Sequence, residues 1–220
     1  MSTPPIDIWP KSVAEAIQLQ QQLRQRVVLK KTYPNFKTFA GVDVSHDTND
    51  ISHAAIVVVD GTTLKPLESV TVSAPTRFPY VPGLLSFREI PVILAALKKL
   101  KRTPDLLMVD GQGIAHPRRL GIAAHLGVLT DLPALGVAKS RLTGRYKEPG
   151  SAKGSHTPLT AGGEHIGTVL RSKEKCLPLF ISPGHKMDQA QALEVTLRCL
   201  TRYRLPEPTR LADKLSKQRD

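Results

Sequence analysis

Cysteine is scarce in this chain, which has two, Cys176 and Cys199, among 220 residues. Two cysteines fit no zinc-ligand spacing and are too few for a disulfide framework in a chain of this length. The sequence also lacks a run of about 18 apolar residues, the length that crosses a bilayer. Residues 1–10 contain prolines and an aspartate instead of the basic and apolar stretches of a targeting leader. We therefore expect a cytoplasmic protein that is neither disulfide-rich nor membrane-spanning.

Acidic residues are outnumbered, because 19 Asp and Glu face 31 Lys and Arg and leave a net charge of +12. A surface this basic concentrates polyanions, of which nucleic acid is the usual one. The alternative is a basic protein that its charge keeps soluble, and we favour nucleic-acid binding. Hydrophobic residues make up 40% of the chain, enough to form a core. We expect one domain over residues 1–220 that ends in a basic, polar tail after Pro206.

The first part of the chain carries one helix signal and three strand signals. Ser12, followed three residues later by Glu15, is a capping-box pattern that predicts the start of a helix. Apolar runs at residues 36–44, 53–60 and 64–73 predict three strands. A short Gly-Thr-Thr turn joins the last two, so we expect an antiparallel meander.

The remainder alternates between helix and strand signals. A Pro-rich bend leads into a helical stretch that contains Pro91 and ends near Lys101. We then predict a strand, a helix, a strand, a mobile loop, two strands and a helix at residues 106–110, 118–129, 134–138, 144–163, 165–171, 176–182 and 188–203. Strand, helix and strand with short connections imply a parallel pair. The whole order predicts an α/β fold, with a mixed sheet of three antiparallel strands plus parallel strands flanked by helices. That order is the one of the ribonuclease H-like architecture.

Two aspartates follow or end predicted strands. Asp43 lies between Gly41 and Ser45 after an apolar run, where it can serve a cleft or cap a turn. Asp110 follows four apolar residues, and a charge there must face solvent, a ligand or a metal. Ligand sites in open α/β sheets lie beyond the carboxyl ends of strands, and the alternative for Asp110 is an ordinary Asp-Gly turn.

Taken together, the two aspartates indicate a metal site. If their strands are neighbours, the carboxylates of Asp43 and Asp110 converge, and a divalent cation relieves their repulsion. Oxygen ligands without cysteine or a histidine pair favour Mg²⁺ or Mn²⁺ over zinc. Such an ion polarises phosphoryl oxygens and orients an attacking water. The sequence therefore predicts a metal-dependent nuclease.

Other candidates are weaker by pattern alone. Glu89 can be a third carboxylate or a solvated helix residue paired with Arg88 or Lys98. Lys139 ends a predicted strand, where it can neutralise a phosphate or simply lie on the surface. Asp213 cannot be placed by its pattern. The seven histidines, His116 and His125 among them, offer no convincing ligand pair, and structural roles are the default for both.

Several long strings, in order along the chain, resemble the endonuclease V family, in its bacterial form. They are AGVDVS, PYVPGLLSFREIP, VDGQGIAHPRRLGIAAHLGV, GVAKSRL, LFISPGHKMD and RLPEPTRLAD. The similarity covers nearly the whole chain and is weakest in the first ten residues and around residues 144–163. Several long matches in order are far more specific than one short motif.

The resemblance implies a ribonuclease H-like DNA repair enzyme. Its family nicks DNA with Mg²⁺ or Mn²⁺ at the second phosphodiester 3′ to a deaminated base, chiefly deoxyinosine, and leaves 3′-hydroxyl and 5′-phosphate ends. Carried over by motif, Asp43 and Asp110 are metal-binding aspartates, Glu89 is the third acidic residue and Lys139 lies by the scissile phosphate. Asp213 occupies a position near the metal where the family has either Asp or His.

The resemblance also implies a lesion-binding region. Tyr80, in PYVP, matches the wedge that enters the strand gap when a base leaves the stack, and Val81 is a mild departure from the family's isoleucine. We hypothesise a pocket whose backbone amides bind the hypoxanthine carbonyl. The lesion-binding set is Tyr80, Pro82, Gly83, Gly111, Gly113 and His116. The partner is DNA containing deaminated bases; the alternatives are inosine in RNA, branched DNA, or a non-catalytic binder of altered nucleic acid.

Overall fold

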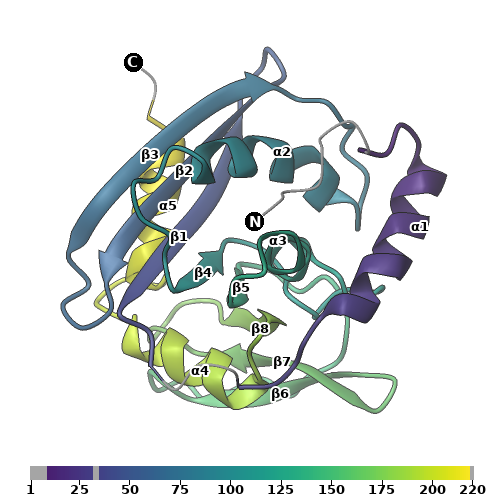
Figure 1. Cartoon of the computed structure of the whole chain (residues 1–220). Helices are drawn as coiled ribbons and strands as arrows, with labels where there is room; N and C mark the ends of the chain where they lie inside the picture. Colours follow the sequence, from purple (N-terminus) through teal and green to yellow (C-terminus); the bar gives the residue numbers. More distant parts are fainter. Residues whose placement is uncertain (1–8, 32–34, 219–220) are drawn as a thin grey trace.

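A computed structural model describes residues 9–31 and 35–218 (Figure 1). The expectation that residues 1–10 carry no leader falls mostly on residues 1–8, which lie outside the described part. The described chain forms an eight-stranded mixed sheet in the order β3-β2-β1-β4-β5-β8-β7-β6, flanked by five α-helices. The ribonuclease H-like α/β prediction is confirmed. Among the described residues, no helix is both long and apolar enough to cross a membrane.

One half of the sheet is the predicted antiparallel meander. It contains β1 (Thr38–His46), β2 (Ile51–Asp60) and β3 (Pro66–Pro75). Asp60 fixes the turn after β2, because its carboxylate accepts from the backbone N–H groups of Thr62 and Thr63 at 3.0 and 2.7 Å. The side chains of β1 alternate between the two faces of the sheet, and this alternation decides which of them can reach the site.

The centre of the sheet is parallel, as predicted. β4 (Leu106–Val109) pairs with β1 on one side and with β5 (Ala134–Ala138) on the other. The crossover between β4 and β5 contains α3 (Ile122–Thr130), which begins four residues later than predicted. Residues 111–121 instead form a loop, closed where the Gly121 N–H donates to the Gly113 carbonyl at 2.9 Å. This loop lies at the carboxyl end of β4, where the site forms.

The other half of the sheet is antiparallel, which the sequence did not indicate. β8 (Leu179–His185) pairs with β5, and β7 (Glu164–Leu170) and β6 (His156–Ala161) continue to the edge. The prediction of a mobile loop over residues 144–163 is therefore wrong for β6. Its composition hides the strand, because Pro158 interrupts the pattern, and an edge strand is where a proline is tolerated.

Helices cover both faces of the sheet (Figure 1). α2 (Leu85–Leu97) and α3 pack on one face through residues such as Ile90, Ile93 and Leu126. α4 (Gln189–Arg198) and α5 (Glu207–Ser216) pack on the other. α1 (Val13–Leu23) begins at the predicted Ser12 cap, packs beside α3 and continues into a short 3₁₀ turn, Arg24–Arg26. The segment expected as a polar tail thus contains a helix that packs against β1.

Candidate active site

Asp43 and Asp110 meet because their strands are parallel neighbours. Val42 of β1 is paired with Val109 of β4, so each aspartate comes one residue after a paired position. The Asp110 N–H also donates to the Val42 carbonyl at 2.9 Å, which continues the ladder to the aspartate itself. Both side chains are largely shielded from solvent. The predicted convergence of the two carboxylates is what the backbone produces.

Asp213 completes a cluster of three carboxylates. It lies on α5, and one carboxylate oxygen from each of Asp43, Asp110 and Asp213 lies within 4.8 Å of the other two. Within the described residues, this is the group of acidic, histidine or cysteine side chains that is arranged to hold a metal ion. We call these three residues the acidic cluster. Asp213, which the sequence pattern alone could not place, is part of it.

Helix α5 is positioned by alternate residues of β1 that share one face. Gly41 permits the helix to approach, because a Cβ at this position would clash with the backbone carbonyl of Pro208. At the other end of α5, the Ser216 hydroxyl donates to Asp43 Oδ2 at 2.5 Å, and the Ser45 hydroxyl donates to the Ser216 carbonyl. Ser216 is buried. One helix therefore brings Asp213 to the cluster and also orients the Asp43 carboxylate.

Lys139, directly after β5, lies between two members of the acidic cluster. Its Nζ is 2.5 Å from Asp110 Oδ2 and 2.6 Å from Asp213 Oδ1. Burial disfavours its charge, but the two carboxylates outweigh burial and raise the pKa of Lys139. Lys217 is 2.8 Å from the other oxygen of Asp213. For Asp213, burial is outweighed by Lys139 and Lys217, which lower its pKa.

The acidic cluster has an excess of negative charge at Asp43. Burial, and then the neighbouring charge of Asp110, raise the pKa of Asp43 to about 7. Two carboxylates this close are stable together when a cation compensates them. Three oxygen donors without sulfur or imidazole are typical of Mg²⁺ or Mn²⁺. The residues present therefore fit a divalent metal ion.

Glu89 lies apart from the acidic cluster. It is on α2, 7% exposed, and its Oε1 lies 3.1 Å from His46 Nε2. His46 Nδ1 in turn contacts the Ser52 hydroxyl at 3.1 Å. Burial raises the pKa of Glu89 despite the opposing effect of His46. The alternative of a solvated helix residue does not hold, because Arg88 pairs with Asp50 and Glu89 faces inward.

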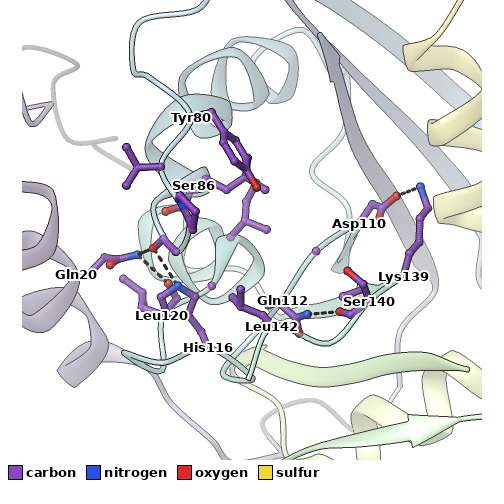
Figure 2. A pocket seen from close by; sticks show the side chains of 18 residues that line it. Gln20, Tyr80, Ser86, Asp110, Gln112, His116, Leu120, Lys139, Ser140 and Leu142 are labelled. Carbon is purple, nitrogen blue, oxygen red and sulfur yellow. Dashed lines mark hydrogen bonds and ion pairs between the residues drawn. The ribbon is translucent and has the colours of Figure 1, made fainter. Parts of the chain in front are cut away.

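A pocket of about 360 Å³ opens beside the acidic cluster (Figure 2). Asp110 and Lys139 form part of its wall, and the loop 80–83 forms another part. Figure 2 shows the Asp110–Lys139 pair on one side of the pocket and the Gln20–His116 region on the other. Tyr80 is 70% exposed, unusual for so large a ring. The site therefore has a charged side, formed by Asp110 and Lys139, next to a pocket that also has apolar lining residues such as Leu120 and Ile122.

The loop at the pocket is held by one carbonyl. The oxygen of Gly83, whose φ of 79° favours glycine, accepts from Gln20 Nε2 at 3.0 Å and from Arg118 Nη2 at 2.8 Å. His116 Nε2 lies 3.0 Å from the same oxygen. Burial lowers the pKa of His116 to about 4, so the ring is neutral near pH 7 and donates through Nε2. Three side chains therefore hold this part of the wall in place, and the imidazole among them is neutral.

The structure brings most of the predicted lesion-binding residues together, but not all of them. The lining includes Tyr80, Pro82, Gly83, Gly111 and His116. Gly113 faces away, since its N–H donates to the Ser182 hydroxyl at 2.8 Å and a Cβ there would clash with the backbone of Pro183. The Gly111 N–H donates to the Val137 carbonyl at 3.3 Å. Both N–H groups are therefore hydrogen-bonded within the protein, and a contact with a base carbonyl would require them to exchange partners.

Sequence reasoning missed three residues that support the site. Gln20 is buried in a helix face that looked polar, and it ties α1 to the Gly83 loop. His46 holds Glu89, and Ser216 holds Asp43. The spacing of Ser216, three residues after Asp213, is a helical signal that was available; the roles of Gln20 and His46 depend on contacts that no local pattern shows.

Comparisons with known proteins agree on one family. A family model described as Endonuclease V matches residues 21–214. An endonuclease V from Xanthomonas oryzae is 56% identical over 213 residues, 96% of this chain and 90% of the relative. The crystal structure of an endonuclease V from Streptomyces avermitilis has a TM-score of 0.90 at 46% identity, covering 95% and 93% of the two chains. An endonuclease V of Ciona intestinalis, in complex with a 24mer DNA containing an inosine followed by a ribo-adenosine, has a TM-score of 0.81 at 28% identity over 94% and 97%.

Proposed function

This chain belongs to the endonuclease V family, in its bacterial form, and we propose that it repairs DNA by nicking beside deaminated bases, chiefly deoxyinosine. The proposed cut is hydrolysis of the second phosphodiester 3′ to the lesion, leaving 3′-hydroxyl and 5′-phosphate ends. One observation carries the proposal: a cluster of three carboxylates lies at the edge of a pocket that Asp110, Lys139 and an exposed tyrosine, Tyr80, line together. We further propose that residues 1–220 act as one endonuclease domain, in the cytoplasm.

The proposed cofactor is Mg²⁺, which Mn²⁺ can replace. Asp43, Asp110 and Asp213 would hold the ion, with Asp43 and Asp110 as its principal ligands. When bound, such an ion polarises a phosphoryl oxygen and favours a water nucleophile at neutral pH. Ser216 holds the Asp43 carboxylate in one orientation before the ion arrives. Preorganised ligands of this kind lower the cost of assembling the site.

Lys139 is the proposed partner of the scissile phosphate. Its ammonium group already lies between Asp110 and Asp213, at the border of the acidic cluster and the pocket. A charge fixed at this border stabilises the negative charge that develops on the phosphoryl oxygens. Glu89 is proposed as a supporting acid that His46 orients, since it lies outside the acidic cluster.

Recognition is proposed to use base extrusion. A deaminated base pairs weakly, so moving it out of the duplex costs less than moving a normal base. Unstacking costs a few kcal/mol, and the exposed ring of Tyr80 can offset part of it by stacking in the gap. The pocket beside Tyr80 would hold the extruded base, with its wall kept in place by Gly83 and His116. The backbone N–H of Gly83 is the amide that we propose to bind the carbonyl of the base.

The test is incubation of the purified protein with an end-labelled duplex that contains one deoxyinosine, with and without Mg²⁺. The proposal predicts a single nick, two phosphodiesters 3′ to the lesion and only with the metal, and no nick in a matched A·T duplex. Inosine-containing RNA and a branched junction run beside it. Faster cutting of either would move the substrate assignment to it, and tight binding of the deoxyinosine duplex without any cut would identify a binder instead.

A further inference from the structure

A row of basic residues leaves the site along one segment of chain. After Lys139, the chain passes Ser140 and Leu142, which line the pocket, and then lies beside β6. On this segment, Arg141, Arg145 and Lys147 are exposed. We call these three residues the basic strip. It is continuous in sequence with the lysine at the acidic cluster.

The basic strip is fixed to the sheet. Arg145 and Thr160 of β6 exchange two backbone hydrogen bonds, at 2.7 and 2.9 Å, so the segment forms a bridge on the sheet edge. Tyr146 packs edge-on against Phe180 with ring centroids 5.5 Å apart. The Arg141 guanidinium lies 5.7 Å from the centre of the Tyr146 ring. The three charges are therefore presented by an ordered backbone.

The positive charge of the basic strip is not neutralised by neighbouring acids. Among the described residues, no carboxylate forms an ion pair with Arg141, Arg145 or Lys147, while eleven other ion pairs are found. The nearest acid in sequence, Glu148, pairs with Arg171 instead. Cations that have no acidic partner on a fixed surface are available to an external anion.

The surface around the basic strip is hollowed. Two adjoining depressions, of about 560 and 450 Å³, share Arg145 and Thr160 in their walls. One extends to the β6–β7 turn at Gly162 and Gly163, and the other includes Lys147. A phosphodiester strand follows such a groove when cations line it, because phosphate contacts need charge and access but no base-specific pairing.

We propose that the basic strip binds backbone phosphates of the DNA that flanks the nicked site, and so supplies affinity without base readout. This inference rests on the proposed function for the identity of the polyanion. The strip begins two residues after Lys139, which is proposed to face the scissile phosphate, so a strand bound in the site can extend onto it. Counterion release from about three phosphates makes this contribution strongly dependent on salt.

The test compares two triple variants of the full chain. In the first, Arg141, Arg145 and Lys147 are each replaced by Gln. In the control, Lys98, Lys99 and Lys101 are replaced by Gln; they are also exposed but lie at the far end of α2, about 20 Å from its pocket end. Binding of a fluorescent duplex is measured from about 0.05 to 0.3 M salt, with and without deoxyinosine.

The expected result has three parts. The strip variant binds at least about tenfold more weakly near 0.1 M salt, and its salt slope is shallower by about 3, on both duplexes alike. The control keeps the parent's affinity and slope, and all three proteins melt alike. An unchanged slope in the strip variant, or a loss confined to the deoxyinosine duplex, would overturn the proposal.

The two proposals can fail separately. Nicking under single-turnover conditions is followed in the same samples, at protein concentrations that saturate each variant. Parent protein that binds with the expected salt dependence but never nicks would refute the proposed function and leave the basic strip standing. A parent that nicks, with a strip variant of equal affinity, would refute the strip alone.

Discussion

The acidic cluster and the pocket next to it are built on opposite electrostatic principles. The cluster places three carboxylates beside two lysines, and burial together with the neighbouring charge of Asp110 raises the pKa of Asp43 to about 7. The pocket wall at Gly83 is held by hydrogen bonds to one carbonyl, with a neutral His116. The first arrangement suits binding a cation and a phosphate, and the second suits holding a neutral base. The difference suggests that chemistry and recognition can be separated by mutation.

The largest expected effect comes from the acidic cluster. Replacing Asp110 with Asn removes a metal ligand with almost no change in shape, and we expect the nicking rate to fall at least about a thousandfold. Affinity for a deoxyinosine duplex should stay within a few-fold, measured by fluorescence anisotropy. Asp50→Asn, at a surface pair with Arg88, is the matched control and should nick as the parent does. Equal loss of binding and nicking in Asp110→Asn would show that chemistry and recognition cannot be separated by this mutation.

The pocket side gives the next largest effect. Tyr80→Ala removes the exposed ring, and we expect about ten- to a hundredfold weaker binding of the deoxyinosine duplex. The nicking of single-stranded deoxyinosine DNA should change little, since no gap has to be filled there. Tyr80→Phe keeps the stacking surface and serves as control. Unchanged duplex affinity in Tyr80→Ala would refute the wedge.

A substitution at Ser216 tests whether α5 orients a carboxylate of the acidic cluster. Ser216→Ala removes the hydroxyl that orients Asp43, and we expect about tenfold weaker Mn²⁺ binding by the metal-free protein. Ser216→Thr, which keeps the hydroxyl, should retain most of the affinity. Calorimetric titration measures both, and melting curves check the fold. Parent-like Mn²⁺ affinity in Ser216→Ala would limit this serine to packing.

The smallest expected effect concerns a buried neutral ring behind the pocket. His125 contacts the Ser86 hydroxyl at 3.0 Å, and burial lowers its pKa to about 3. The unfolded chain therefore takes up a proton near pH 6.5 that the folded chain does not, and stability falls as the pH drops below that value. His125→Asn should lose about 1 kcal/mol less than the parent between pH 6.5 and 5.5. Urea unfolding at the two pH values measures this, and equal losses would show that His125 does not contribute.

Local patterns located the aspartates on the strands but not their partners on helices. Asp43 and Asp110 were predictable as neighbours because apolar runs define β1 and β4, and each aspartate comes at the end of such a run. The pairing of these two strands then brings the aspartates together. Asp213 was identified through family resemblance, and the Ser216–Asp43 contact joins residues 173 apart in the sequence. A short, polar helix such as α5 gains its stability from packing on β1, which no local window contains.

Local patterns also failed to show which distant segments support the pocket. Tyr80 and Gly83 were identified through family resemblance, but the contact of Gln20 with the Gly83 carbonyl requires a helix from the start of the chain. Gly113 does not line the pocket, because a glycine that permits close approach can face either a ligand or a neighbouring strand. Here the neighbour is β8. Composition alone could not separate these two uses of glycine.

The central claim is that the acidic cluster holds the divalent ion on which nicking depends. Its most direct test is Mn²⁺ titration of the metal-free full chain, followed by electron paramagnetic resonance, for the parent and for Asp43→Asn. The account predicts saturable binding in the parent that is lost in the variant while circular dichroism stays the same. Equal Mn²⁺ binding by the two proteins would place the ion elsewhere and contradict the account.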